Sequence, residues 1–300
     1  MQRTLYFSRP CRLRLSQGQL VYRFRDDDTE GRAPIEDLGF VVVDHREITF
    51  SSALIADLLE YNVMLITCDA GHYPTGLLLP LEGHHIQQER YKAQIEARTP
   101  LKKQLWMQVI KAKLNNQAGL LQKLHLEEKP LRLWARNVRS GDPMNLEARA
   151  GAYYWPLVFS HHIGTFRRDR YGQPPNNLLN YGYALLRAAC ARALVGAGLL
   201  PTLGIFHRNK YNAFALADDI MEPYRPYVDL IVKEILDDGD NLEELSKEVK
   251  SKLLGLFSLP LIVEDEKSNL MGGLNRTATS LVRCYVGSGK GLTFPELNAT

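Results

Sequence analysis

The feature that most constrains this fold is a change of hydrophobic periodicity early in the chain. Over residues 1–75, short apolar or alternating segments are separated by turn residues, which is typical of β-strands. From Ile86 onward, apolar residues recur at helical spacing. We therefore expect an α+β fold, with a small β-rich domain over residues 1–80 and a larger all-helical domain over residues 81–290. The glycine-containing end, residues 291–300, is expected to be a disordered tail.

One segment of the helical region, from Leu101 to Leu124, has the pattern of a long amphipathic helix. Its apolar residues fall on or near one face: Leu101, Leu105, Val109, Ala112 and Leu120. Its lysines fall off that face: Lys102, Lys103, Lys111 and Lys113.

Composition excludes several classes of protein. The chain has 300 residues, of which 45% are hydrophobic and 24% charged, the balance of a soluble globular protein. No apolar run approaches the ~18 residues of a membrane span, and the N-terminus lacks the apolar core of a signal peptide. The cysteines are far apart and form no C-x-x-C pair, so we expect neither a disulfide framework nor a zinc–thiolate site. These features predict a cytoplasmic protein that does not bind membranes.

The formal net charge of +3 hides a strong asymmetry along the chain. Residues 1–90 carry a net charge of −4, residues 91–212 carry +13, and residues 213–300 carry −6. A basic segment of this kind is the electrostatic footprint of proteins that bind phosphate backbones. Solvated helix faces rich in lysine would produce the same balance, so charge alone leaves nucleic-acid binding open.

A candidate metal site consists of one histidine and up to three carboxylates. His207 ends an apolar run, and Asp219 and Glu222, at i and i+3, share one face of a helix. Glu147 lies early in a helix that an Asp-Pro pair just before it is expected to start. Carboxylate oxygens with one imidazole suit Mn²⁺ or Mg²⁺, and such an ion beside a basic segment indicates phosphodiester chemistry. The alternative is that His207 is an ordinary core or surface histidine and Glu222 a solvated carboxylate.

Candidate DNA contacts lie in the same basic segment. A guanidinium group matches the geometry of a phosphate, and an aromatic ring can stack on a base. The residues concerned are Arg136, Arg139, Arg167, Arg168, Arg170 and Tyr181. Each arginine could instead make a surface salt bridge, and Tyr181 could pack within its own helix.

Several motifs, taken together and in order, resemble a known family. They are Thr4-Leu5-Tyr6-Phe7 with Arg12-Leu13, Asn145-Leu146-Glu147-Ala148 with Tyr154-Trp155, Pro175-Asn176-Asn177-Leu178-Leu179-Asn180-Tyr181-Gly182-Tyr183-Ala184-Leu185-Leu186, Gly204-Ile205-Phe206-His207, and Leu216-Ala217-Asp218-Asp219-Ile220-Met221-Glu222-Pro223-Tyr224-Arg225-Pro226. Over nearly its whole length the sequence resembles the integrase and metal-dependent DNA endonuclease of CRISPR spacer acquisition, in the form found in type II systems.

The resemblance implies an architecture, an assembly and a set of ligands. The family has an N-terminal β-domain and a C-terminal helical domain, joined by a hinge. It forms homodimers, two of which flank a dimer of a small ferredoxin-like adaptation partner in a 4:2 complex. Its Mg²⁺ or Mn²⁺ ion is held by residues that carry over to Glu147, His207 and Glu222. Some relatives use an acidic residue that falls on Asp219, so the choice between the two acidic positions stays open, with Glu222 favoured.

The reaction that the resemblance implies is a transesterification on double-stranded DNA. The 3′-hydroxyl of a short foreign duplex attacks a phosphodiester at the leader–repeat junction, and a second attack follows at the far end of the repeat. No nucleoside triphosphate is consumed, which fits the absence of a G-x-x-x-x-G-K-[ST] motif from the sequence.

Two other functions remain open from the sequence. The first is a non-catalytic DNA-binding scaffold of an adaptation complex, in which Glu147 and His207 have no chemical role. The second is a metal-dependent phosphoesterase that acts on small molecules. The extended basic stretch argues against the second, because a small substrate does not need so extended a positive field.

Overall fold

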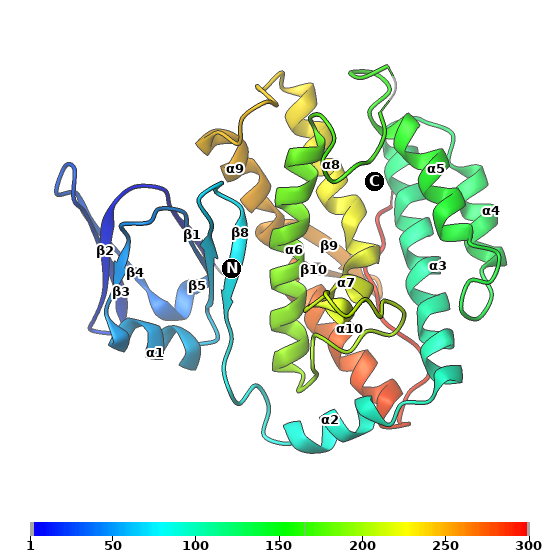
Figure 1. The fold of residues 1–300 in the computed structure, drawn as a ribbon, viewed down its shortest axis with the longest axis horizontal. Coiled ribbons are helices and arrows are strands. Elements are labelled where there is room, and N and C mark those ends of the chain that lie inside the picture. The colour runs from blue at the N-terminus through cyan, green and yellow to red at the C-terminus, as the bar shows by residue number, and fades with distance from the viewer. Residues whose placement is uncertain (1–2, 165, 299–300) are drawn as a thin grey trace. The chain divides into compact units, whose positions relative to one another are not determined.

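The computed structural model describes residues 3–164 and 166–298. The chain divides into two compact units, residues 1–82 and residues 83–300 (Figure 1). The boundary expected from the sequence, after residue 80, lies just before this division. The first unit is rich in strands and the second is mainly helical, which confirms the expected α+β fold class.

The first unit contains a mixed sheet with strand order β1-β5-β7-β8. Its strands are β1 (Arg3–Phe7), β5 (Leu38–Val43), β7 (Met64–Cys68) and β8 (Pro74–Leu78). Strand β5 pairs in parallel with β1 on one side and with β7 on the other. Every position of β5 is buried, as a continuous apolar run requires of a central strand that is covered on both faces.

A second sheet of the first unit has strand order β4-β3-β2-β6. Its strands are β2 (Cys11–Ser16), β3 (Gln19–Phe24), β4 (Glu30–Pro34) and β6 (Thr49–Phe50). Strand β2 alternates, with Leu13 buried and Arg12 and Arg14 exposed. The hairpin between β2 and β3 turns at Gln17 and Gly18, where φ is 50° and 68°, a conformation that glycine adopts without a Cβ clash.

Helix α1 (Ser52–Glu60) completes the first unit. The hydroxyl of Ser51 accepts a hydrogen bond from the backbone N–H of Leu54 at 3.3 Å and so caps the helix start. Leu13 of β2, Val41 of β5 and Leu54 of α1 belong to one buried apolar cluster. This shared core holds the sheets and the helix together as one unit.

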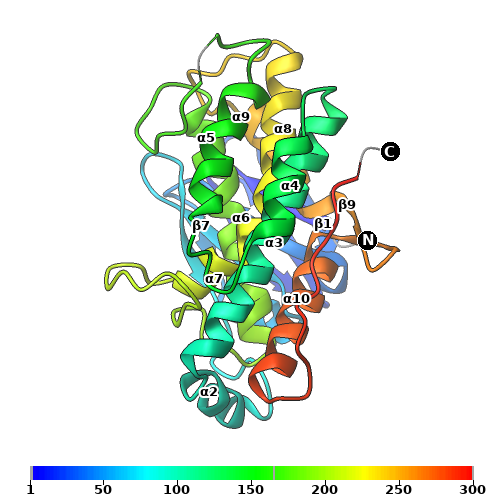
Figure 2. The ribbon, with the colours of Figure 1, turned by 90° about the vertical axis from the view of Figure 1, so that its right-hand side faces the viewer.

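The second unit is organised around α3 (Thr99–Lys123) and α6 (Asn176–Gly196). Helices α4 and α5 pack beside α3, and α7, α8 and α10 pack beside α6 (Figures 1 and 2). The other elements are α2 (Gln87–Ile95), α4 (Lys129–Asn137), α5 (Leu146–Val158), α7 (Ala215–Met221), η2 (Glu222–Tyr224), α8 (Arg225–Asp237), α9 (Lys247–Leu254), η3 (Gly255–Ser258), β9 (Pro260–Val263), β10 (Glu266–Asn269) and α10 (Leu270–Tyr285). None of the helices in the described residues is long and apolar enough to cross a membrane.

The second unit is not all-helical, which corrects the expectation from the sequence. Strands β9 and β10 form an antiparallel hairpin between η3 and α10. Its turn, at Glu264 and Asp265, has positive φ at both residues (53° and 63°). The alternation in this segment is too short to stand out from the helical pattern on either side of it.

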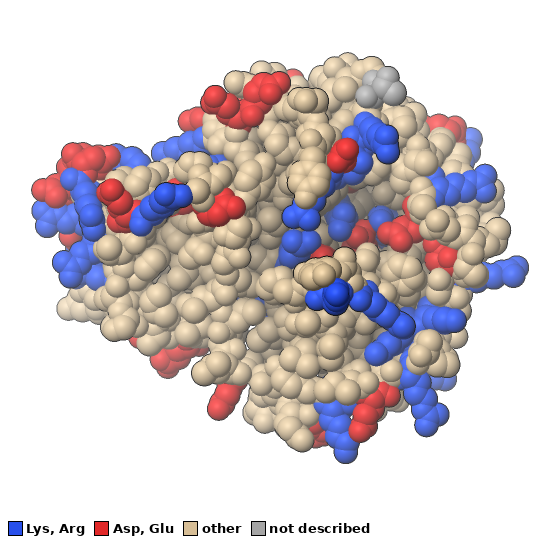
Figure 3. All heavy atoms as spheres, viewed as in Figure 1, with Lys and Arg blue, Asp and Glu red and all other residues tan. Residues whose placement is uncertain are grey.

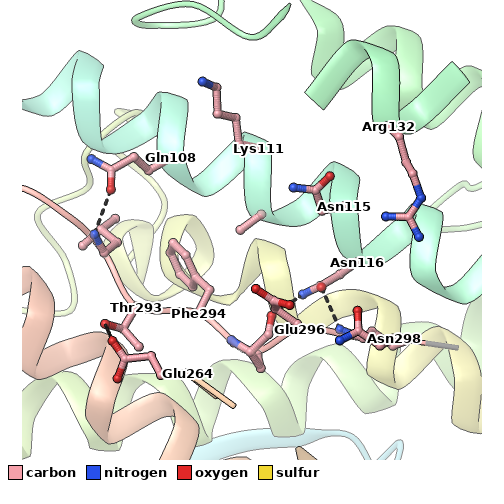
Figure 4. Close-up of a pocket in the computed structure, with 14 residues that line it drawn as sticks. Gln108, Lys111, Asn115, Asn116, Arg132, Glu264, Thr293, Phe294, Glu296 and Asn298 are labelled. Atoms are coloured by element: carbon pink, nitrogen blue, oxygen red, sulfur yellow. Dashed lines mark hydrogen bonds between the residues drawn. The ribbon is translucent and has the colours of Figure 1, made fainter. Parts of the chain in front are cut away.

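The expectation of a disordered tail is wrong for residues 291–298, here called the C-terminal segment. It runs along α3 and is held there by side-chain amides (Figures 2 and 4). The Asn116 side chain donates to the carbonyl of Pro295 at 2.9 Å and accepts from the N–H of Leu297 at 3.0 Å. A Cβ on Gly119 would lie 1.6 Å from the carbonyl oxygen of Leu297, so only glycine permits this approach. The side chains that hold the C-terminal segment lie on α3, far away along the chain. The composition of the segment therefore does not reveal that it is ordered.

Candidate active site

The candidate residues of the second unit come from separate elements whose side chains lie close together. Glu147 lies in the first turn of α5, Asp219 in α7 and Glu222 in η2, while His207 lies in the loop between α6 and α7. Lys113 reaches them from α3. Figure 3 shows a hollow in this face of the second unit, in which acidic and basic side chains lie together.

The start of α5 places Glu147 at the site. The helix begins at Leu146, later than the Asp-Pro pair predicts, and Asn145 before it has φ of 51°. The Asp142 carboxylate nevertheless caps the helix, because its oxygens accept from the N–H groups of Leu146 and Glu147, both at 3.0 Å. This cap fixes the first turn, and with it the direction of the Glu147 side chain.

Glu222 is almost completely buried and lies between two cations. Its side chain is 4% exposed; Oε1 lies 2.9 Å from Arg225 Nη2 and Oε2 lies 2.7 Å from Lys113 Nζ. Burial alone would raise the pKa of Glu222, but the positive charges of Arg225 and Lys113 outweigh it and hold the pKa below its ordinary value. Glu222 is therefore ionised at neutral pH despite its burial.

Lys113 joins the two glutamates. Its Nζ lies 2.7 Å from Oε1 of Glu147 and 2.7 Å from Oε2 of Glu222. Burial alone would lower the pKa of Lys113, but the charges of Glu222 and Glu147 outweigh it and raise the pKa above its ordinary value. The expectation that Lys113 lies off the apolar face of α3 is wrong, because its side chain is only 15% exposed. The signal was its spacing from Trp106 and Val109, which places all three on one stripe of α3.

His207 is held by a hydrogen bond and by aromatic packing. Its Nδ1 lies 2.5 Å from Oδ1 of Asp219, which leaves Nε2 as the ring nitrogen available to a ligand. The hydrogen bond to Asp219 raises the pKa of His207, and the charges of Glu222 and Glu147 act in the same direction. The ring packs edge-on against Trp106, with centroids 5.8 Å apart. These contacts fix the plane and the tautomer of the imidazole.

Asp219 serves as the anchor of the His207 loop. Its side chain is 0% exposed, and Oδ2 accepts from the N–H groups of Ile205 at 2.6 Å and Phe206 at 2.9 Å. A Cβ on Gly204 would come within 2.4 Å of the His207 carbonyl oxygen and 2.9 Å of Asp219 Oδ2, so the loop needs glycine there. Both oxygens of Asp219 thus accept hydrogen bonds from the His207 loop. Asp219 therefore does not face the same site as Glu222, although the two were expected on one helix face.

A divalent cation fits part of this arrangement. Oε2 of Glu222 is buried and accepts no hydrogen bond of good geometry from the described residues, which makes it a suitable cation ligand. Glu147 lies on the other side of the Lys113 ammonium, and the His207 imidazole is oriented by Asp219. Across residues 3–164 and 166–298, however, no three His, Cys, Asp or Glu side chains are grouped closely enough to hold an ion as they stand.

The candidate DNA contacts divide into exposed and engaged residues. Arg136, Arg139, Arg167 and Arg170 are exposed. Arg168 is instead engaged, because its guanidinium donates to the side-chain oxygens of Asn176 at 2.8 Å and Asn180 at 2.7 Å. Tyr181 is 0% exposed, so its ring packs inside the protein, as the alternative from the sequence proposed. In this position it cannot stack on a base.

A separate cavity of about 540 Å³ lies between α3 and the C-terminal segment (Figure 4). Gln108, Lys111 and Asn115 line it from α3, and Thr293 and Glu296 line it from the C-terminal segment. Among the described residues that line it there is no Glu147, His207 or Glu222. The cavity is therefore distinct from the candidate active site.

Known proteins match nearly the whole chain. The family described as CRISPR associated protein Cas1 matches residues 5–251. A CRISPR-associated endonuclease Cas1 from Neisseria meningitidis serogroup C (strain 8013) is 35% identical over 280 residues, which cover 93% of this chain and 90% of the relative. A solved casposase bound to integration product aligns with a TM-score of 0.80 at 18% identity, over 97% of this chain and 92% of that one. A chain of a Cas6-RT-Cas1–Cas2 complex aligns with a TM-score of 0.72 at 21% identity, over 97% of this chain and 35% of that one. At such identities the two structural likenesses show the fold.

Proposed function

Because the chain belongs to the Cas1 family of CRISPR-associated proteins, we propose that it is a divalent-metal-dependent DNA endonuclease and integrase of spacer acquisition. The family supports a nuclease or integrase role, and the assignment to a type II system is part of the proposal. The observation that carries the metal-dependent chemistry is the meeting of Glu147 and Glu222 at one ammonium, beside an imidazole oriented by Asp219.

The metal ligands in this proposal are Glu147, Glu222 and Nε2 of His207, with Mg²⁺ or Mn²⁺ as the ion. Such an ion, when bound, neutralises charge on the phosphate and makes an attacking hydroxyl easier to deprotonate. The protein itself contributes orientation. Asp219 holds the His207 ring, Asp142 holds the start of α5, and Arg225 keeps Glu222 ionised in a buried position.

The proposed reaction exchanges one phosphodiester bond for another. The 3′-oxygen of an incoming DNA duplex forms a new bond to a phosphorus atom of the CRISPR repeat. The bond from that phosphorus to the 3′-oxygen of the nucleotide that flanks the repeat breaks, and the released oxygen takes up a proton. Because one phosphodiester is made for each one broken, the step needs no nucleoside triphosphate. Hydrolysis by the same centre would give the endonuclease activity.

The partners we propose are DNA and other protein chains. One of the similar structures is a casposase bound to integration product, and another is a Cas6-RT-Cas1–Cas2 complex. By analogy we propose that this chain forms a homodimer and joins a small ferredoxin-like adaptation partner in a 4:2 complex. The basic segment of residues 91–212 supports DNA as the ligand. A cytoplasmic location is part of the same proposal.

The test is an integration assay with a labelled duplex that carries a 3′-hydroxyl and a plasmid that carries a repeat. We expect Glu147→Gln and His207→Ala to lower strand transfer by at least about a hundredfold. Glu248→Gln is the matched control, because Glu248 lies in the first turn of another helix, α9, and is exposed. If strand transfer persists at the wild-type rate in Glu147→Gln and His207→Ala, the chain is a non-catalytic DNA-binding scaffold.

A second measurement separates DNA from a small substrate. Binding of a duplex that neutralises many phosphates weakens steeply with salt, in proportion to the number of contacts. A flat salt dependence of DNA affinity, together with hydrolysis of small phosphodiesters, would favour the phosphoesterase.

A further inference from the structure

The Lys113 ammonium lies between the two carboxylates that the proposed function assigns to the metal. Its Nζ is 2.7 Å from an oxygen of Glu147 and 2.7 Å from an oxygen of Glu222. Glu147 Oε1 accepts a hydrogen bond from this ammonium, and Glu222 Oε2 forms an ion pair with it. A positive group therefore already holds the two carboxylates together.

The place of Lys113 on the inward-facing side of α3 directs its side chain toward the carboxylates. Trp106 and Val109 precede it on the same stripe of α3, and both are buried. The Lys113 side chain is only 15% exposed. A lysine side chain has a flexible stem of four carbons, so the ammonium can move away from the carboxylates while the helix stays in place.

The charges around Lys113 are balanced as they stand. Glu147 and Glu222 supply two negative charges, and Lys113 and Arg225 supply two positive charges. The neighbouring His207 is turned toward Asp219 through Nδ1. A divalent ion added beside the ammonium would leave a half-buried site with two excess positive charges, which a site of low dielectric opposes strongly. Arg225 binds the other oxygen of Glu222, so it does not stand in the way.

We propose that Lys113 is a built-in counter-cation, which keeps Glu147 and Glu222 together in the metal-free centre and gives up its place to the divalent ion. It is thus a positioning residue that sets the metal affinity of the centre. This inference rests on the proposed metal site. It explains why no three ligands are grouped for an ion in the described residues while the ammonium occupies the space between two of them.

The test measures binding of Mn²⁺ alone to the whole chain, by calorimetry or by electron paramagnetic resonance, at constant pH and ionic strength. We expect Lys113→Met to bind Mn²⁺ at least about tenfold more tightly than wild type, because no ammonium competes for the carboxylates. Lys111→Met is the matched control, since it removes the same charge from the same helix at the cavity beside the C-terminal segment. Its Mn²⁺ affinity should stay within about twofold of wild type.

A second readout follows the metal-free protein. Lys113→Met should melt at a lower temperature than wild type without metal, because two carboxylates then face each other without a shared cation. Saturating Mn²⁺ should raise its melting temperature by more than it raises that of wild type. Should Lys113→Met not fold, Lys113→Gln removes the charge and keeps a hydrogen-bond donor, and it should bind Mn²⁺ more tightly for the same reason.

The outcomes separate this inference from the proposed function. If both Lys113 variants bind Mn²⁺ as tightly as wild type or more weakly, the inference is overturned. Loss of strand transfer in these variants would not rescue it, because Lys113 would then act on the DNA. Mn²⁺ binding by Glu147→Gln that equals that of wild type would instead overturn the metal centre itself. Tighter binding in Lys113→Met with weaker binding in Glu147→Gln supports both.

Discussion

Asp219 and His207 form an acid–imidazole pair in which Oδ1 of the buried carboxylate lies 2.5 Å from Nδ1 of the partly exposed ring. The same carboxylate accepts hydrogen bonds from three backbone N–H groups of the His207 loop, those of Ile205, Phe206 and His207. Asp219 therefore holds the histidine rather than offering an oxygen to an ion, a division of labour often found around metal-ligating imidazoles.

We predict that Asp219→Asn lowers strand transfer by about 10–100-fold, because the ring loses the acceptor that selects its tautomer. The same change should lower the free energy of unfolding by about 2 kcal/mol or more, since the loop N–H groups lose a charged acceptor. Urea denaturation and the integration assay measure the two effects. Asp265→Asn, at an exposed turn, should leave both unchanged. A direct role for Asp219 as a ligand would be indicated by loss of Mn²⁺ binding as complete as that in Glu222→Ala.

Asp229 predicts a pH-dependent stability. Burial raises its pKa to about 6, although the hydroxyls of Tyr183 and Tyr154 donate to it and Arg225 and Arg168 lie near. The folded chain therefore binds this proton more tightly than the unfolded chain does, so the stability falls as pH rises from about 4 through about 6.

We expect the unfolding free energy of wild type to fall by about 2 kcal/mol relative to Asp229→Asn between pH 4 and pH 7.5. The comparison isolates Asp229, because every other titrating group is present in both proteins. Urea denaturation of both at several pH values measures it. A difference that does not change with pH would show that Asp229 stays charged, or stays neutral, throughout.

Two helical glycines make opposite predictions. Gly119→Ala places a methyl group where the Leu297 carbonyl oxygen lies, so the C-terminal segment must leave α3, at a cost of about 3 kcal/mol. Gly151→Ala meets no heavy atom of another described part of the chain within 4 Å and should stabilise α5 by up to about 1 kcal/mol. Hydrogen exchange at the Leu297 amide should quicken only in Gly119→Ala. Unchanged exchange there would mean that the segment is not held by this contact.

Arg167 and Arg168 are adjacent but should behave differently. Arg167 is exposed, so Arg167→Ala should weaken DNA binding with little effect on stability, and reduce the salt slope by about one phosphate contact. Arg168 fastens its loop to α6 through Asn176 and Asn180, so Arg168→Ala should lower the free energy of unfolding by about 1–3 kcal/mol. Equal losses of DNA affinity with equal stabilities would contradict this division.

Local patterns predicted much of this molecule. The alternation of Arg12, Leu13 and Arg14 correctly indicated a half-buried strand, and the long apolar spacing from Leu101 correctly indicated a helix. Such patterns succeed because the direction of each side chain follows from the backbone repeat of its own element. Residue types and their order also indicate Glu147, His207 and Glu222 as candidate ligands, and their role in metal binding stays a prediction.

The tertiary structure decided which residues meet. Lys113 reaches Glu147, 34 positions away, and Asn116 reaches Pro295, 179 positions away. Asp219 turned inward to His207, while Glu222, three residues later, faces Lys113. By itself, the sequence determined most strands of the first unit, most of the helices and the types of ligand available, because these depend on near neighbours. Only the packing of α3 against α5 and η2 decided which cation lies between the carboxylates, because contacts so distant along the chain leave no local pattern.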